Sequence, residues 1–280
     1  MASQPEHRLP FATRLVARAV EKPWGRRQLG PWGLGLGSTG QPIGEIHHVT
    51  PAGDDRPLLI KTLFTAERLS VQVHPDDAAA AARGHRRGKD EAWVVLASDP
   101  GAEIGLGLDQ SLDPASLRAA ALDGSLVDRL VWRPARAGDV FYTPAGTIHA
   151  IGGGLTLLEI QQNLDVTYRL FDYGRGRRLD LDDGIAVAST SPWQPQAGCA
   201  ANRQRLVDCP AFVIERGRGP GQIAASAATP VWVAVVSGIG RIDGAVLRPG
   251  EVWLVEGPLR VTGDAELVIA HEGGGAWVAA

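Results

Sequence analysis

The clearest feature of the chain is strict alternation between apolar and polar residues in its first half. In Leu69–His74 the polar positions are Ser70, Gln72 and His74, and Pro75 follows them. Successive side chains of a β-strand point to opposite faces, so the pattern predicts a strand that carries its polar groups on one face. Pro75 is expected to end it.

A second alternation starts at Lys89 and places Lys89, Glu91 and Trp93 on one face of a predicted strand that continues through the apolar run Val94–Leu96. The connecting segment Asp76–Gly84 begins with an aspartate suited to N-capping, continues in alanines and ends in glycine. It predicts one short helix that brings the two strands together. Glu91 could then reach inward, or it could balance nearby arginines.

The longest alternation runs from Leu158 to Leu170 and predicts one continuous strand with an entirely polar face. That face carries Glu159, Gln161, Asn163, Asp165, Thr167 and Arg169. Exposed edges of antiparallel sheets usually carry mixtures of lysine and glutamate, whereas this is an ordered set of hydrogen-bonding groups. We interpret it as the face of a functional site, with an exposed edge as the alternative.

The segment Gly138–His149 reads GDVFYTPAGTIH, with the spacing G-x5-P-x-G-x2-H. Pro144 and Gly146 predict a tight corner between two strands, after which His149 projects an imidazole nitrogen that is able to bind a cation. The spacing resembles the second metal-binding motif of cupin barrels. The run Gly152–Gly154 is interpreted as a hairpin turn rather than a phosphate-binding loop, because no capped helix follows it.

Further helices are expected in Asp113–Leu130, as two short pieces broken at Asp123–Gly124, and in Leu179–Ser189. Residues 191–204 contain two prolines and little periodicity, which predicts a linker. It would separate a metal-binding domain at 1–190 from a C-terminal β domain at 205–280.

In the C-terminal part, short β-rich runs alternate with glycine-bearing turns. Leu247–Trp253 echoes Ala135–Phe141, but no histidine follows in the place of His149, and His271 is interpreted as structural. The expected fold is therefore mainly β: two cupin-like jelly-roll barrels with a few short helices, the first metal-binding and the second degenerate.

Composition limits the classes of function. The 280 residues are 44% hydrophobic and carry a formal net charge of −3, which gives no general attraction to nucleic acid or to acidic membranes. The first 20 residues contain no continuous apolar run, so neither a signal peptide nor a membrane helix is expected, and cytoplasmic residence is predicted. Cys199 and Cys209 lie outside any metal or redox spacing and are expected to be free thiols.

Lysine is rare in the chain. Lys22, Lys61 and Lys89 are its only lysines among 28 basic residues. Because nearly all other basic residues of this chain are arginines, a lysine can mark a position that needs a compact ammonium group. Lys61 and Lys89 lie close in sequence to the candidate ligands. Chance survival of these lysines is the alternative.

The motifs together resemble the type I mannose-6-phosphate isomerases in their short bacterial form. The resemblance covers residues 20–185 in order, through KPWGRRQL, LLIKTLFTAERLSVQVHPDD, GKDEAWVVL, PAGTIHAIGGG and LEIQQNLDVTYRLFDYGR. It implies a zinc-dependent isomerase that interconverts mannose 6-phosphate and fructose 6-phosphate through a cis-enediolate, acting as a monomer or homodimer.

The resemblance also implies the site residues. One zinc ion per chain would be held by Gln72, His74, Glu91 and His149. Catalytic roles fall to Lys89, Glu159, Asp165 and Arg169, and substrate contacts to Lys61, Ser70, Lys89 and Arg169. Glu159 is preferred over Asp165 as the base, because a hairpin near Gly154 would place Glu159 opposite His149.

One departure from the family pattern and two alternative functions stay open. In GEIHH, His47 and His48 stand where relatives usually place a tryptophan, and they are expected on the surface or on the rim of the pocket. A cupin dioxygenase that uses His74, Glu91 and His149 around iron is one alternative function. A non-catalytic sugar-binding cupin is the other.

Overall fold

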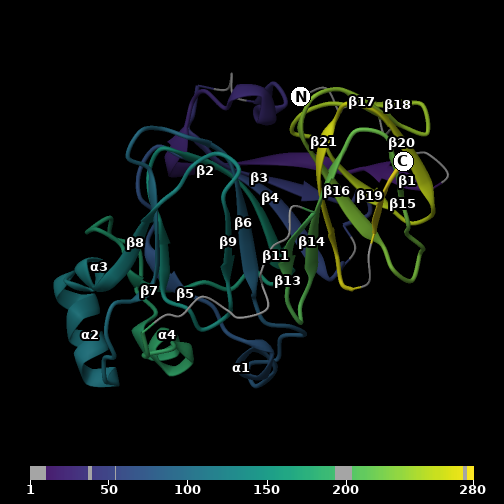
Figure 1. Ribbon diagram of the computed structural model, residues 1–280. Coiled ribbons are helices and arrows are strands. Elements are labelled where there is room, and N and C mark those ends of the chain that lie inside the picture. The colour runs from purple at the N-terminus through teal and green to yellow at the C-terminus, as the bar shows by residue number, and fades with distance from the viewer. Residues whose placement is uncertain (1–10, 37–39, 54, 193–203, 274–275) are drawn as a thin grey trace. The chain divides into compact units, whose positions relative to one another are not determined.

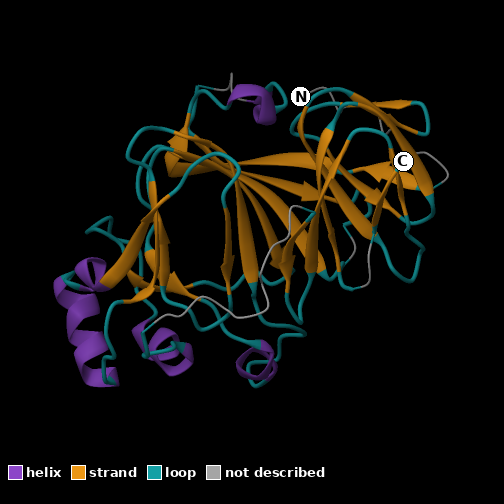
Figure 2. Cartoon of the chain, in the orientation of Figure 1, coloured by secondary structure: helices purple, strands orange, loops and turns teal. Residues whose placement is uncertain are grey.

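The computed structural model describes residues 11–36, 40–53, 55–192, 204–273 and 276–280 (Figure 1). The chain forms two compact units. The central unit comprises Lys22–Arg26 and Leu63–Gln196, and the terminal unit comprises Met1–Glu21, Arg27–Thr62 and Ala197–Ala280. The described residues are mainly in antiparallel strands, with a few short helices, as predicted (Figure 2).

Two sheets build the central unit. One has the order β12-β5-β10-β7-β8, and the other contains the run β11-β6-β9. The strands are β5 (Val71–Val73), β6 (Glu91–Ser98), β7 (Glu103–Leu108), β8 (Leu130–Pro134), β9 (Val140–Thr143), β10 (His149–Ile151), β11 (Leu155–Gln162) and β12 (Tyr168–Phe171).

The inner faces of these sheets share an apolar core that contains Trp93, Leu106, Ile151 and Leu157. The outer face of the β12-β5-β10-β7-β8 sheet packs against helices, as Figure 2 shows. These helices are α2 (Pro114–Asp123), α3 (Leu126–Arg129) and α4 (Leu181–Val187), whereas α1 (Asp77–Ala81) follows β5 and is not part of this apolar core. Val71 and Val73 belong to this outer core, so the intervening Gln72 faces inward.

Local sequence explains the helix ends. Asp76 caps α1 by accepting a hydrogen bond from the Ala79 N–H at 2.7 Å, as predicted from the sequence. Gly124, with φ of 86°, ends α2 in the left-handed conformation and produces the predicted break before α3. The expected helix in 179–189 is α4.

Two predictions for this region are wrong. The alternation from Leu158 to Leu170 is not one strand, because β11 ends at Gln162 and β12 starts at Tyr168 in the other sheet. Gly152–Gly154 is not a hairpin turn either, since β10 pairs with β5 and β7 while β11 pairs with β6. The glycines instead carry the chain from one sheet to the other, with the Gly154 N–H donating to the Thr65 carbonyl at 2.7 Å.

The terminal unit contains two further antiparallel sheets, of order β1-β19-β16-β21-β14-β13 and β18-β17-β20-β15-β22. Their strands are β1 (Ala12–Arg14), β13 (Arg205–Asp208), β14 (Val213–Arg218), β15 (Gly221–Ile223), β16 (Val231–Ser237), β17 (Gly240–Ile242), β18 (Ala245–Leu247), β19 (Val252–Val255), β20 (Leu259–Gly263), β21 (Glu266–His271) and β22 (Trp277–Ala279). The 3-10 helix η1 (Gly30–Gly33) and β3 (Ile43–Val49) also belong to this unit, and β2 (Val16–Arg26) and β4 (Leu58–Thr65) run through both units.

An apolar core that includes Val233, Trp253 and Ile269 fills the terminal unit. His271 is buried there, and its Nδ1–H donates to the Gly273 carbonyl at 2.9 Å, which agrees with a structural role. The units group residues 1–21 and 27–62 with the C-terminal part, whereas the sequence prediction placed all of 1–190 in one domain. Most of the predicted linker lies outside the described residues.

Two smaller expectations concern cysteines and membranes. Cys209 carries a thiol whose Sγ lies 3.2 Å from the Phe212 carbonyl oxygen, and Cys199 lies outside the described residues. Within the described ranges, every helix is too short or too polar to cross a lipid bilayer.

Candidate metal centre

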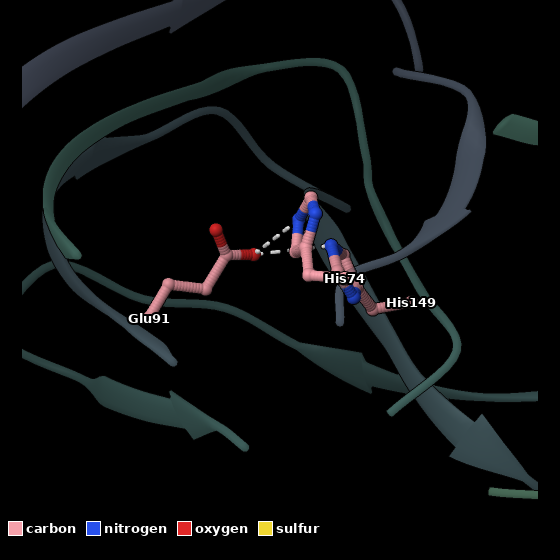
Figure 3. A group of neighbouring side chains, drawn as sticks. All are labelled: His74, Glu91 and His149. Atoms are coloured by element: carbon pink, nitrogen blue, oxygen red, sulfur yellow. Dashed lines mark ion pairs between the residues drawn. The ribbon is translucent and has the colours of Figure 1, made fainter. Parts of the chain in front are cut away.

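Three buried side chains of the central unit converge on one point: His74, Glu91 and His149 (Figure 3). Glu91 Oε1 lies 3.4 Å from His74 Nε2 and 3.1 Å from His149 Nε2. Their ligand atoms all lie within 4.8 Å of one another, and each side chain is at most 1% exposed. Among the described residues this is the one group of histidine, cysteine or carboxylate side chains arranged to hold a metal ion.

Strand register creates this convergence. His149 on β10 lies directly opposite Gln72 on β5, and Gln72 lies opposite Arg169 on β12. Directly opposed residues share a face, so these three side chains form an inward row across one sheet. Glu91 begins β6 in the facing sheet, and His74 follows β5 directly.

Backbone carbonyls fix the tautomers of the two histidines. Nδ1 of His74 lies 2.9 Å from the Val166 oxygen, and Nδ1 of His149 lies 2.9 Å from the Thr147 oxygen. A carbonyl oxygen only accepts, so each Nδ1 carries a proton and, in the neutral ring, each Nε2 keeps its lone pair. Such bonds are typical of metal-binding histidines, because they orient the ring and raise the basicity of the ligating nitrogen.

The electrostatics favour a cation at this point. Burial opposes ionisation of Glu91, but the Lys89 ammonium, 2.9 Å from Oε2, and the neighbouring His74 outweigh it and hold the pKa of Glu91 well below its usual value. Burial, followed by the charge of Lys89, lowers the pKa of His74 to about 4, so the imidazole is neutral at neutral pH. Two nitrogen lone pairs and a carboxylate oxygen therefore face one another.

Oε2 of Glu91 forms an ion pair with Lys89, whereas Oε1 faces the two histidine Nε2 atoms and has no hydrogen-bond partner among the described residues. Buried polar atoms normally have one, so this arrangement fits a metal ion that would bind all three groups. Two imidazole nitrogens and one carboxylate are donors that zinc and other divalent transition metals accept.

Gln72 lies beside this set, as expected for the implied fourth ligand. Its amide presents Nε2 to His149 Nε2 at 3.2 Å, and its Oε1 accepts from the Ser70 hydroxyl at 3.2 Å. Rotation of the amide by half a turn would direct Oε1 toward the histidine, since the two ends of the group have nearly the same shape. Ser70 is buried on the same face, as the alternation predicted.

Lys89 and Arg169 are the cations of the site. Lys89 Nζ lies 3.0 Å from His74 Nε2 and is 5% exposed, so its ammonium is held inside the unit. Arg169 Nη1 donates to the Arg178 carbonyl at 3.1 Å, while its Nε is buried without a hydrogen-bond partner in the described structure. Burial, followed by the charge of Arg177, lowers the pKa of Arg169.

The two candidate bases differ in position. Glu159 is 5% exposed on β11 directly opposite Trp93, and its Oε2 accepts from the indole N–H at 3.0 Å. It faces the interior, although not through the hairpin that was expected. Asp165 is exposed on the segment between β11 and β12, because the predicted continuous strand does not form there.

Other site expectations fall in the terminal unit. Lys61 is buried in β4, at 6% exposure. The interpretation of His48 as a surface or rim residue is wrong, because it is 3% exposed and its Nε2 lies 3.1 Å from Thr62 Oγ1. His47 is partly exposed and its Nε2 lies 2.6 Å from Glu45 Oε2.

Trp93 is a site residue that the sequence analysis did not assign. Its indole binds Glu159, and its ring meets the His149 imidazole edge-on at a centroid distance of 5.4 Å. The signal was present, because Trp93 alternates with Lys89 and Glu91 on one face. The same pattern is equally typical of a core tryptophan, and Trp93 is in fact also part of the apolar core.

The paired antiparallel sheets and the buried His–Glu–His set define a cupin-type β protein with one candidate metal centre among its described residues. Among curated proteins, the chain is 34% identical over 236 residues to the mannose-6-phosphate isomerase of Streptococcus mutans, covering 77% of this chain and 74% of that protein. It is 33% identical over 241 residues to mannose-6-phosphate isomerase ManA of Bacillus subtilis, covering 78% and 76%. The chain belongs to the mannose-6-phosphate isomerase family.

Solved structures agree on the fold. The mannose 6-phosphate isomerase from Bacillus subtilis matches with a TM-score of 0.79 at 23% identity, over 93% of this chain and 99% of that one. A mutant of phosphomannose isomerase from Salmonella typhimurium matches with a TM-score of 0.70 at 15% identity, over 93% and 99%. No protein-family model matches the chain.

Proposed function

We propose that this protein is a zinc-dependent aldose–ketose isomerase that interconverts mannose 6-phosphate and fructose 6-phosphate. The observation that carries the proposal is the convergence of His74, Glu91 and His149 in a member of the mannose-6-phosphate isomerase family. The sugar phosphate is its small-molecule partner. Cytoplasmic location, a monomeric or homodimeric state and a catalytic domain at 1–190 stay predictions.

Zinc is the proposed metal, at one ion per chain. His74, His149 and Glu91 supply nitrogen and oxygen ligands of the kind zinc accepts, and the amide oxygen of Gln72 is the fourth. With one carboxylate among neutral ligands, a bound zinc keeps a net positive charge and would stabilise negative charge developing on the substrate oxygens.

The isomerisation moves a proton between C1 and C2 through a cis-enediolate, and the chain must supply a base and charge stabilisation. Glu159 is the proposed base, because it is buried, faces the interior and has Oε2 fixed by Trp93. The Arg169 guanidinium, on the inward row with Gln72 and His149, is proposed to stabilise the enediolate or to hold a phosphate oxygen. Asp165 remains the alternative base.

Three further groups are proposed to bind substrate. Lys89 has its ammonium inside the site and would orient a hydroxyl or meet the phosphate. Ser70 lies beside Gln72 on the same inward face. Lys61, a buried lysine of β4, is assigned from the family resemblance.

Metal analysis combined with an assay of mannose 6-phosphate turnover tests the proposal. We expect about one zinc per chain and turnover that a chelator removes and zinc restores. Iron with no isomerisation would favour the cupin dioxygenase instead. Bound metal with sugar phosphate binding but no turnover would favour the non-catalytic sugar-binding cupin.

A further inference from the structure

The inward face of the β11-β6-β9 sheet carries a row of three polar side chains. Glu91 on β6 lies directly opposite Thr143 on β9 and directly opposite Gln161 on β11. Opposed residues in antiparallel strands share a face, so Thr143 and Gln161 flank the carboxylate on its two sides. Thr143 is 1% exposed, and Glu91 and Gln161 are fully buried.

The amide of Gln161 is fixed in one orientation. Its Nε2 donates to the Gln162 carbonyl at 2.9 Å and to the Leu164 carbonyl at 3.0 Å. Both partners only accept, so the amide nitrogen must face them and Oε1 must point the other way. Oε1 is buried and has no hydrogen-bond partner within the described part of the chain.

Thr143 repeats this observation on the other side of Glu91. Its Oγ1 is buried and likewise has no hydrogen-bond partner in the described structure. Buried polar atoms without partners are rare, because each loses its bonds to water. Two such atoms, one on each side of Glu91, indicate that a ligand bound beside Glu91 would supply the missing partners.

We propose that Gln161 and Thr143 are binding residues of this site and that together they hold an O–H group at the metal centre. Gln161 Oε1 accepts a hydrogen bond from that group, and the Thr143 hydroxyl bonds to the same ligand from the other side of Glu91. The O–H belongs to a sugar hydroxyl or to a water molecule on the cation. The inference rests on the proposed function for the identity of the sugar.

Thr143→Val provides the cleanest test, because valine keeps the shape and removes only the hydroxyl. The probe is mannitol 1-phosphate, which keeps the hydroxyls and the phosphate but lacks a reacting carbonyl. We expect its Kd to rise about 10-fold, the size expected for one lost hydrogen bond. The thermal midpoint of the metal-free protein should not fall, since that hydroxyl has no partner to lose.

Thr65→Val is the matched control. Thr65 is also fully buried, but its Oγ1 donates to the Gly152 carbonyl at 2.7 Å and accepts from the Leu155 N–H at 3.0 Å. This variant should lower the thermal midpoint and leave the Kd of mannitol 1-phosphate within twofold. Gln161→Met should weaken binding at least as much as Thr143→Val, and Thr143→Val decides the question if Gln161→Met does not fold.

The visible absorption spectrum of the cobalt-substituted protein separates the two sources of the O–H group. If the spectrum of either ligand-free variant differs from that of the ligand-free wild-type protein, the O–H group belongs to a water molecule on the cation. An unchanged spectrum with weaker mannitol 1-phosphate binding identifies a sugar hydroxyl. Unchanged spectra and unchanged binding in Thr143→Val would overturn the inference.

These readouts do not depend on turnover. A wild-type protein that binds the polyol phosphate but does not isomerise mannose 6-phosphate would refute the proposed function and leave the inference standing. If the wild-type protein isomerises mannose 6-phosphate but the variants bind mannitol 1-phosphate like wild type, the proposed function would stand and the inference would be refuted.

Discussion

At the scale of single residues, partners from distant segments fix the chemistry of each side chain at the centre. The Val166 and Thr147 carbonyls leave both histidine Nε2 atoms as lone-pair donors, and Lys89 keeps Glu91 ionised although it is buried. The site is therefore prepared for a cation before one binds.

Arg169→Ala tests charge stabilisation. We expect kcat to fall by a factor on the order of 10² or more, the scale for losing one preorganised charge stabiliser. The thermal midpoint should change little, because the contacts of Arg169 to Arg178 and Asp180 are partly exposed. Near-normal kcat with a clearly lower melting temperature would make Arg169 a structural residue instead.

Glu159→Gln and Asp165→Asn compare the two candidate bases. Only the base should control exchange of the substrate's C2 hydrogen with solvent deuterium. In Glu159→Gln we expect exchange and isomerisation to fall together by about 10² to 10⁴, with zinc retained, and the effect of Asp165→Asn to be milder. Exchange that survives in Glu159→Gln and disappears in Asp165→Asn would reverse the assignment.

His48 gives a pH-dependent contribution to stability. Burial, followed by the nearby His47, lowers the pKa of His48 from 6.5 to about 3. The imidazole is protonated more readily in the unfolded chain than in the folded one. The contribution of His48 to the free energy of unfolding is therefore complete above about pH 6.5 and is lost as the pH falls toward about 3. In the metal-free protein, His48→Asn should show a shallower decrease of unfolding free energy between these values than wild type, whereas His85→Asn, at an exposed position, should not.

At the scale of strands and turns, the sequence predicted which side chains share a face more reliably than where strands end. Alternation correctly placed Gln72, Glu91 and Glu159 on inward faces. It did not show the break after Gln162, because the polar–apolar pattern continues through a segment that crosses to the other sheet. The glycine run at 152–154 was misread since a hairpin and a sheet-to-sheet connection use the same residues.

Asp90 shows how elements hold the ligands in place. It lies between the inward residues Lys89 and Glu91, and its own oxygens accept from the Tyr142 hydroxyl and the Ala145 N–H, both at 2.7 Å. These bonds tie the start of β6 to β9 and to the corner that precedes His149.

We expect Asp90→Ala to weaken metal affinity about 10-fold, the lower end of the range for lost supporting bonds around a metal site. Competition with a chelator measures this affinity. Asp113→Ala is the control, because Asp113 accepts comparable bonds from Ala115 and Ser116 as the N-cap of α2. That variant should lose about 1 kcal/mol of stability with unchanged metal affinity, and an equal loss of affinity in both would refute a local role for Asp90.

At the scale of the whole molecule, the three candidate ligands all belong to the central unit. The sequence correctly predicted a mainly β chain. It did not predict that residues 1–21 and 27–62 group with the C-terminal strands, because long-range pairing leaves no local signal in those segments. Thr143 was missed for a related reason, and Gln161 was placed on the polar face without a role of its own, since the importance of both residues depends on lying opposite Glu91 across two strand pairs.

The most direct test of the proposed metal centre is the metal content of His149→Ala beside that of wild type, measured by elemental analysis after purification. We expect about one zinc per chain in wild type and none retained in the variant, together with loss of mannose 6-phosphate isomerisation. Removing one of three convergent ligands leaves His74 and Glu91 without a site that can close around the ion. Full zinc occupancy in His149→Ala would show that this residue is not a ligand and would contradict the proposed centre.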